Sequence, residues 1–271
     1  GLESSAMASL YSSRSTLGAA RCSNSRAFFK ARAAPVRAVV SRRPTADVRA
    51  QLTFKDEASG VEWPVAQKFW EGEPFRCLGA VTRAKKIVLV SVKVYSCTAY
   101  VEADRCAKEL GIRQRGGFFQ NDDDFCSAIL DGAFSKALLI RLVRDVEGQQ
   151  FTDALNDKLA PRMQLAGEMD KLEEFKKAFE GKKLANGTEV AMLWNVVGDL
   201  EVLVTPPQST PRAYDTLKPD LRIRSISLCR AMFETFMGQS SVVPEGRKVW
   251  AEGSRKLLES ENVNRAAFKA P

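Results

Sequence analysis

Arg83, Lys93 and Tyr95 stand out because they lie in an otherwise apolar stretch, residues 78–101 (LGAVTRAKKIVLVSVKVYSCTAYV). A cation and a phenol that face the interior of a protein are costly unless a partner satisfies them. An acidic ligand satisfies both groups. The alternative is that Arg83 pairs with a carboxylate of the protein itself, while Tyr95 points to water. The residues alone leave both interpretations open.

Few other residues suggest chemistry. The sequence contains no histidine, which excludes Ser-His-Asp and Cys-His catalysis and histidine-based zinc sites. Glycine-rich phosphate-binding motifs and the GxSxG motif are also missing. Three consecutive carboxylates, Asp122–Asp124, cannot all face one ion, so we interpret them as the first turn of a helix. We expect no metal, no cofactor and no catalytic residue.

The positive charge of the chain lies almost entirely at one end. Of 41 basic and 33 acidic residues, nine and two lie within residues 1–50, so the remainder carries 32 and 31. Nucleic-acid binding therefore loses its main support. Residues 7–50 are rich in Ala, Ser and Arg, which is typical of an organelle transit peptide. We expect a chloroplast (plastid stroma) location, with the mitochondrion as second choice. A basic tail that binds an acidic surface is the alternative.

Residues 51–271 read as a single domain after this 1–50 segment. Hydrophobic periodicity predicts short strands at 51–55 and 60–63, then either one long strand over 78–101 or a hairpin turning near Ala84-Lys85. The other predicted strands are 136–146, 188–194 and 199–205. Helices are predicted at 104–111, 122–131, 149–163, 170–183, 226–237 and 249–258. This order indicates an α+β fold with a mostly antiparallel sheet. The six cysteines are scattered without CxxC spacing, so we interpret them as unpaired thiols.

Three blocks in the right order resemble the chalcone isomerase family: LGAVTRAKKIVLVSVKVYSCTAYVE, LLIRLVRDVEGQQFTDALNDKLAPRM and SISLCRAMFETFMGQSSVVPEGRKVWAEG. The resemblance spans about residues 60–258. It implies the fold of that family, an open-faced β-sandwich in which helices cover a large antiparallel sheet.

The resemblance also assigns site residues. Arg83 falls where the isomerases keep an arginine that contacts the substrate oxyanion, and Tyr95 falls where they have a threonine. Their helical tyrosine, lysine and asparagine correspond here to Phe151, Ala154 and Lys158. The two changes at 151 and 154 remove polar groups that cyclisation needs.

An arginine and a tyrosine with an apolar helix resemble the plastid fatty-acid-binding branch of the family. That branch implies that Arg83 and Tyr95 hold the carboxylate of a long-chain free fatty acid without catalysis. The expected cleft lining is Phe151, Ala154, Leu155, Lys158, Thr235 and Phe236. The departure Ser96-Cys97-Thr98 leaves the chain-length preference open.

We expect a fatty-acid partner, no nucleic acid and no stable membrane insertion, because no window of 18 apolar residues occurs. The oligomeric state is not predicted. Two alternatives remain, a chalcone isomerase-type intramolecular lyase and a non-catalytic partner protein of another enzyme.

Overall fold

One antiparallel sheet organises the fold, and the computed structural model describes residues 52–70, 72–87, 90–208 and 212–269. Within these residues the sheet has the order β11-β10-β9-β6-β5-β4-β3, and each neighbouring pair is antiparallel. The strands are β3 (Ala66–Gln67), β4 (Phe75–Ile87), β5 (Val90–Glu102), β6 (Lys136–Leu142), β9 (Glu189–Trp194), β10 (Asp199–Thr205) and β11 (Leu221–Arg224). The predicted α+β class with an antiparallel sheet is confirmed.

Two short ribbons and several helices complete the described part of the chain. The ribbons pair β1 (Thr53–Lys55) with β2 (Glu62–Pro64) and β7 (Val146–Glu147) with β8 (Lys183–Leu184). The helices are α1 (Ala103–Arg115), α2 (Asp122–Asp131), α3 (Gly148–Ala166), α4 (Met169–Lys177), α5 (Ile226–Met237), α6 (Pro244–Lys269) and a 3-10 turn at Tyr214–Thr216. Among them, none has the length and apolarity that crossing a bilayer requires.

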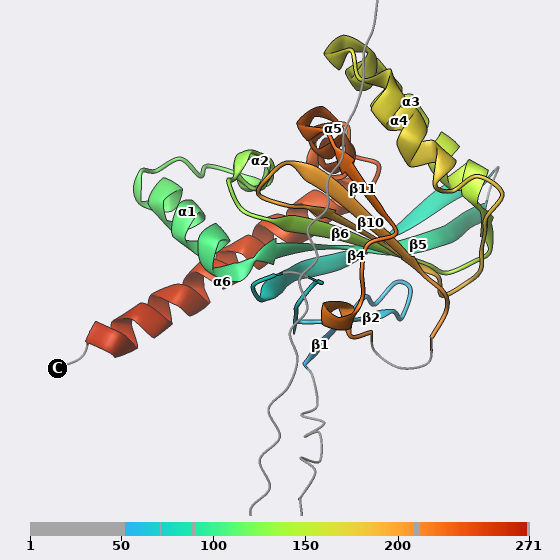
Figure 1. Cartoon of the computed structure of the whole chain (residues 1–271). Coiled ribbons are helices and arrows are strands. Elements are labelled where there is room, and N and C mark those ends of the chain that lie inside the picture. Colours follow the sequence, from blue (N-terminus) through green and yellow to red (C-terminus); the bar gives the residue numbers. More distant parts are fainter. Residues whose placement is uncertain (1–51, 71, 88–89, 209–211, 270–271) are drawn as a thin grey trace, which may run out of the picture. The chain divides into compact units, whose positions relative to one another are not determined.

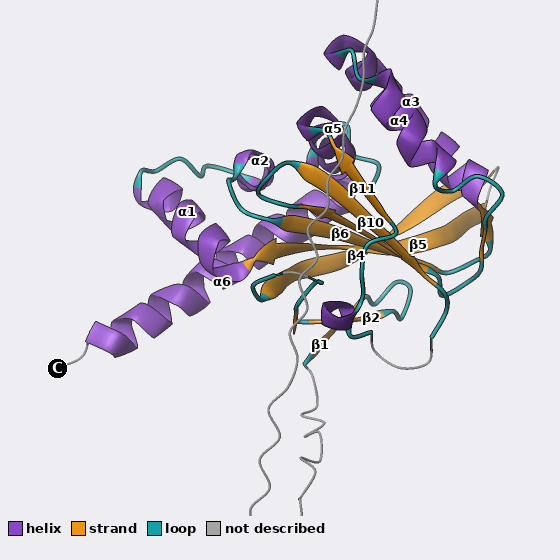
Figure 2. Cartoon of the chain, viewed as in Figure 1, coloured by secondary structure: helices purple, strands orange, loops and turns teal. Residues whose placement is uncertain are grey.

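The two faces of the sheet bury different side chains. Figures 1 and 2 show α3, α4 and α5 on one side of the strands and the β1–β2 ribbon on the other. Successive side chains of a strand alternate between faces. On β5, Cys97 joins the larger apolar cluster with helical residues such as Phe236, whereas Tyr100 packs with Trp63 of the ribbon. We call the first the helix-covered face and the second the ribbon-covered face.

Two helices, α2 and α5, start at a residue whose side chain caps them. Asn121 accepts a hydrogen bond from the backbone N–H of Asp124, whose side chain returns the bond, so α2 starts with a capping box. The predicted role of Asp122–Asp124 as the first turn of a helix is confirmed. Ser225 caps α5 by accepting from the N–H of Leu228. The predicted starts of both helices, at residues 122 and 226, coincide with these caps.

A bulge in β4 changes the side of the sheet to which the following residues point. Cys77 pairs with Tyr100 and Ala80 with Thr98, so two β4 residues lie opposite one β5 residue. Gly79 adopts a φ of 116° there, a region that side chains other than hydrogen disfavour. Strict alternation from Phe75 would turn position 83 toward the ribbon. Because of the bulge, Val81 packs in the helix-covered cluster and Arg83 falls on the same face.

Two sequence predictions about strands were incomplete. The stretch 78–101 is a hairpin, but its turn is not at Ala84-Lys85, since both residues lie inside β4 and pair with β5. The pairing of the two strands continues to Ile87 and Val90 instead. The sequence also missed β11, because its four residues LRIR carry two arginines and little apolar signal.

Lys136 is a buried cation at the start of β6. Its ammonium donates hydrogen bonds to the carbonyls of Ile129, Leu130 and Gly132 at the C-terminal end of α2, at 2.6, 3.2 and 2.8 Å. The rings of Phe134 and Trp194 lie 4.8 and 4.3 Å from it. Burial lowers the pKa of Lys136 to about 8, because the charged form loses its hydration.

The Lys136 pKa predicts a pH-dependent stability. Between pH 8 and the ordinary pKa of 10.5 the unfolded chain binds more protons at this lysine than the folded one, so the free energy of unfolding rises with pH. Relative to Lys136→Met, the wild type should gain up to about 3 kcal/mol over this range. Urea denaturation at several pH values measures the difference. Lys108→Met, an exposed change on α1, is the control, and a flat difference for Lys136→Met would contradict the account.

Gly79→Ala should destabilise the protein more than an alanine at another left-handed glycine. A Cβ at Gly79 would lie 2.5 Å from the Cγ1 atom of Val249, whereas one at Gly117, with φ of 73°, meets nothing within 4 Å. Both changes introduce backbone strain of about 1–3 kcal/mol, and only Gly79→Ala adds a clash of similar cost. Denaturant titration of both variants checks this. Equal losses of stability would show that the bulge is not tightly packed.

Candidate functional site

Arg83 and Tyr95 face each other across the β4–β5 pair. They are register partners, so their side chains emerge side by side on the helix-covered face. The Arg83 Nη1 atom lies 3.4 Å from the Tyr95 Oη, and the Arg83 Cζ atom lies 5.8 Å from the centre of the ring. The two residues that the sequence singled out are therefore in contact.

The pair keeps hydrogen-bonding capacity for a further group. Tyr95 is 6% exposed, and burial raises the pKa of its phenol, so the hydroxyl keeps its proton. Among the described residues that hydroxyl has only the long bond from Arg83, in which it accepts, and the Arg83 guanidinium has no carboxylate partner. Within the described chain, the alternative in which Arg83 pairs with a protein carboxylate and Tyr95 points to water is thus not realised.

Lys93 does not belong to this group. Tyr95 pairs with Arg83 but Lys93 pairs with Ala84, so Val94 is an extra residue on β5. This second bulge turns Lys93 toward the ribbon, where its ammonium donates to the carbonyl of Ala58. The sequence placed Lys93 in the same polar group because simple alternation puts residues 93 and 95 on one face.

Asp56 is a residue near the pair that the sequence analysis missed. It lies between β1 and β2 on the opposite side of the same strands and is 4% exposed. Its carboxylate accepts hydrogen bonds from the hydroxyls of Ser59, Thr82 and Ser96 at 2.6, 2.5 and 2.6 Å. Burial acts to raise the pKa of Asp56, but these bonds together with that from Ala58 N–H hold it below its ordinary value. A local signal existed, since Asp56 and Gly60 bracket a turn, but the partners on β4 and β5 are distant in sequence.

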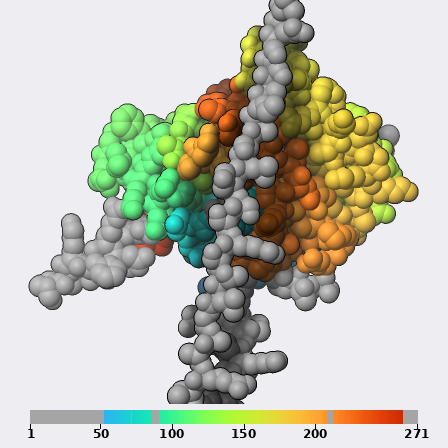
Figure 3. Space-filling view, in the orientation of Figure 1, coloured from blue at the N-terminus to red at the C-terminus, as the bar shows by residue number. Residues whose placement is uncertain are grey.

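Most of the predicted cleft lining lies in the buried core. Phe151 and Leu155 on α3 are 5% and 3% exposed, and Thr235 and Phe236 on α5 are 1% and 0% exposed. Phe151, Leu155 and Phe236 belong to the same apolar cluster as Tyr95. The side chains of α3 and α4, yellow in Figure 3, form a continuous surface with neighbouring orange segments. The apolar residues therefore share one buried cluster, and their role as a cleft lining stays a prediction.

Two predicted lining residues differ from the rest. Ala154 is exposed, although its i+3 spacing from Phe151 places it at the edge of the same face of α3, and its place in the cleft lining stays a prediction. Lys158 is partly buried, and its backbone carbonyl accepts a hydrogen bond from Arg162 at 2.7 Å. The methyl group of Ala154 and the lysine therefore add little to an apolar interior.

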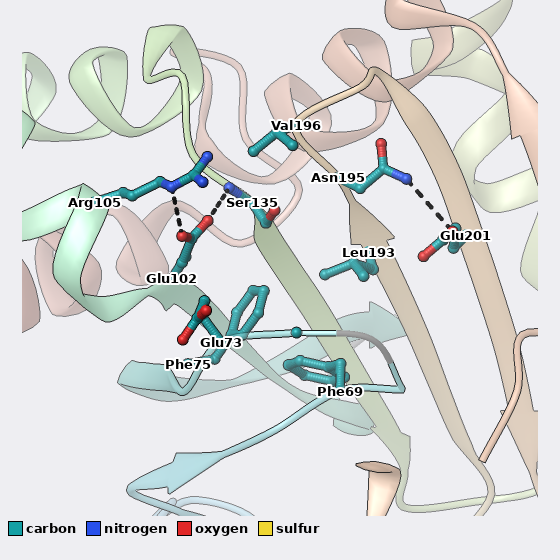
Figure 4. A pocket seen from close by; sticks show the side chains of 11 residues that line it. Phe69, Glu73, Phe75, Glu102, Arg105, Ser135, Leu193, Asn195, Val196 and Glu201 are labelled. Atoms are coloured by element: carbon teal, nitrogen blue, oxygen red, sulfur yellow. Dashed lines mark hydrogen bonds and ion pairs between the residues drawn. The ribbon is translucent and has the colours of Figure 1, made fainter. Parts of the chain in front are cut away.

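Hollows occur elsewhere on the described surface. One of about 390 Å³ lies at the end of the sheet, where Phe69, Phe75 and Leu193 form an apolar floor (Figure 4). Several of its polar groups pair with one another: Arg105 with Glu102 at 2.9 Å and Asn195 with Glu201 at 3.4 Å. Neither Arg83 nor Tyr95 borders this hollow or the three of about 420–510 Å³. The pair on the helix-covered face remains the candidate site, because its donors have unused hydrogen-bonding capacity among the described residues.

Comparison with known proteins relates this arrangement to one family. The family model for chalcone-flavanone isomerase matches residues 58–257. The chalcone–flavanone isomerase of Hordeum vulgare is 23% identical over 74% of this chain and 89% of its own, and that of Oryza sativa subsp. japonica is 22% identical over 79% and 95%.

A solved structure shows the same fold. The crystal structure of a fatty-acid binding protein of Arabidopsis thaliana superposes with a TM-score of 0.62 at 16% sequence identity, covering 76% of this chain and 99% of that one. At this identity the likeness concerns the fold. The helix-covered antiparallel sheet and the match over 58–257 together show that this chain belongs to the chalcone-flavanone isomerase family.

Proposed function

We propose that this protein binds free fatty acids without transforming them. The observation that carries the proposal is the Arg83–Tyr95 pair, which offers an always-charged guanidinium and a protonated hydroxyl on the covered side of the sheet. A carboxylate complements both donors. The fold neighbour from Arabidopsis thaliana, a protein whose description is fatty-acid binding, supports the same ligand class.

The acyl chain supplies most of the affinity in this proposal. At about 0.8 kcal/mol per buried methylene, a sixteen-carbon acid has a gross driving force on the order of 11 kcal/mol before entropy losses. The apolar residues beside Tyr95, including Phe151 and Leu155, are the proposed surroundings of the tail. Because these side chains are buried, the acyl chain enters only if they separate from one another. The Arg83–Tyr95 pair then orients the acid and selects it over neutral lipids.

Catalysis is the competing function, since the curated relatives are chalcone–flavanone isomerases. The resemblance places Phe151 and Ala154 where those enzymes have a tyrosine and a lysine. A phenylalanine cannot order water through a hydroxyl, and an alanine donates no hydrogen bond. One positioned donor alone is worth about 10²–10³ in rate. We therefore favour binding over isomerisation, and flavanone formation from chalcone would overturn this choice.

Arg83→Ala should weaken dodecanoate binding about 10- to 100-fold, since hydrogen bonds to charged groups contribute about 1.5–3 kcal/mol. Tyr95→Phe should weaken it less, because it removes one neutral donor. Isothermal titration calorimetry with dodecanoate and hexadecanoate measures both effects. Arg144→Ala, a change of an exposed arginine, is the matched control. Unchanged affinity in Arg83→Ala, or no binding by the wild type, would contradict the proposal.

We also propose that residues 1–50, which lie outside the described residues, direct the protein to the plastid. Their Ala, Ser and Arg content supports this role. A fusion of residues 1–50 to a fluorescent protein should accumulate in chloroplasts, and the same protein fused to residues 51–271 should not. Mitochondrial or cytosolic fluorescence of the first fusion would contradict the proposal.

A further inference from the structure

The Asp56 carboxylate accepts hydrogen bonds from two residues that pair with each other on neighbouring strands, β4 and β5. Thr82 on β4 and Ser96 on β5 are register partners, and both hydroxyls donate to the same Asp56 Oδ2 atom. Ser96 also accepts a hydrogen bond from the Trp63 indole at 3.1 Å. One carboxylate oxygen thus ties both strands to the β1–β2 ribbon.

This pair of residues is next to the candidate site. Thr82 directly precedes Arg83 and Ser96 directly follows Tyr95, so the tied pair and the site pair are neighbouring rungs of one ladder. Their side chains point to opposite faces, as alternation requires. Asp56 therefore lies on the ribbon-covered side and does not contact a ligand held by the Arg83 and Tyr95 side chains on the other side.

The short run of β4–β5 pairs that includes Arg83 and Tyr95 needs an interaction that fixes its register. Its pairs run from Ala80↔Thr98 to Arg83↔Tyr95, with a bulge at each end. A shift of one residue in register sends every side chain of a strand to the opposite face. At the first bulge, Gly79 provides the special backbone conformation, and its carbonyl accepts from Thr98 and Trp250 at 2.9 and 3.1 Å. Near the second bulge, Asp56 binds Thr82 and Ser96, the pair next to Arg83 and Tyr95.

The carboxylate suits this role better than a neutral group. It has several acceptor positions, and it receives three hydroxyls and the N–H of Ala58. Hydrogen bonds to an ionised acceptor are shorter and about twice as strong as neutral ones. The lowered pKa of Asp56 keeps it ionised at neutral pH. The hydrogen bonds from Thr82 and Ser96 to the ionised Asp56 carboxylate are therefore present at any pH at which a fatty acid is also ionised.

We propose that Asp56 is a positioning residue that keeps Arg83 and Tyr95 on one face of the sheet and so sets the selectivity of the site for acids. This inference rests on the proposed function, because selectivity matters only if the site binds an acid. It also makes a claim about the free protein: without Asp56 the Tyr95 ring leaves its buried position.

The test compares the affinities for dodecanoate and dodecanol in Asp56→Ala, Asp56→Asn and Ser59→Ala. Ser59→Ala is the matched control, because it removes a hydrogen bond to Asp56 without touching β4 or β5. We expect Asp56→Ala to lower the acid-to-alcohol selectivity at least tenfold while alcohol affinity changes less than threefold. Asp56→Asn, which keeps the shape, should have a smaller effect, and Ser59→Ala should change selectivity less than twofold.

A purely structural role gives a different result, since general loosening weakens acid and alcohol binding equally. That outcome, or unchanged selectivity in Asp56→Ala, would overturn the inference. Arg83→Ala provides a second check, because adding Asp56→Ala to it should cause no further loss of selectivity.

A measurement without ligand separates this inference from the proposed function. The ring resonances of the four tyrosines can be followed by NMR in the free protein. In Asp56→Ala and Asp56→Asn the Tyr95 ring should shift toward solvent-exposed values, and in Ser59→Ala it should not. If the wild type binds no dodecanoate, the proposed function fails while these spectra still decide the role of Asp56. A Tyr95 ring unchanged in both Asp56 variants would contradict that role.

Discussion

The site depends on a guanidinium that the sheet turns toward an apolar interior. A buried or half-buried cation requires a partner, because the charge loses hydration, and the described residues give Arg83 only the hydroxyl of Tyr95 at 3.4 Å. Lys136 shows how the same protein treats a cation that has a structural role: three carbonyls and two aromatic rings surround it. The contrast between these two cations is the reason why we propose a ligand for Arg83.

The orientation of Arg83 follows from irregularities in the strands rather than from their regular pattern. The bulge at Gly79 moves position 83 onto the helix-covered face, and the bulge at Val94 sends Lys93 to the other one. Between the two bulges lie four β4–β5 residue pairs, which include Arg83 with Tyr95. Asp56 connects one of them, Thr82 with Ser96, to the β1–β2 ribbon. Bulges beside functional residues commonly redirect a side chain in this way. The β1–β2 ribbon is thereby connected to the strands of the candidate site from the opposite face of the sheet.

Local signals predicted much of the fold and only part of the site. The bounds of α2 and α5 were predicted from their apolar periodicity, and the structure shows that Asn121 and Ser225 cap their starts. Arg83 and Tyr95 were identified as unusual residues in an apolar stretch, and the structure brings them together. The hairpin turn and the separation of Lys93 from the pair were not predicted, because bulges override alternation in strands. The exposure of Ala154 on α3 was not predicted either. Asp56 was missed because its hydroxyl partners on β4 and β5 lie 26 and 40 residues away.

The most direct test of the account is a crystal structure of the protein with a fatty acid that carries bromine at the end of its acyl chain. Anomalous scattering would locate the bromine, and the density would locate the carboxylate. The account predicts carboxylate oxygens within hydrogen-bonding distance of the Arg83 guanidinium and the Tyr95 hydroxyl, with the bromine among the apolar residues beneath α3 and α5. A carboxylate bound elsewhere, with Arg83 and Tyr95 unchanged from the free protein, would contradict it.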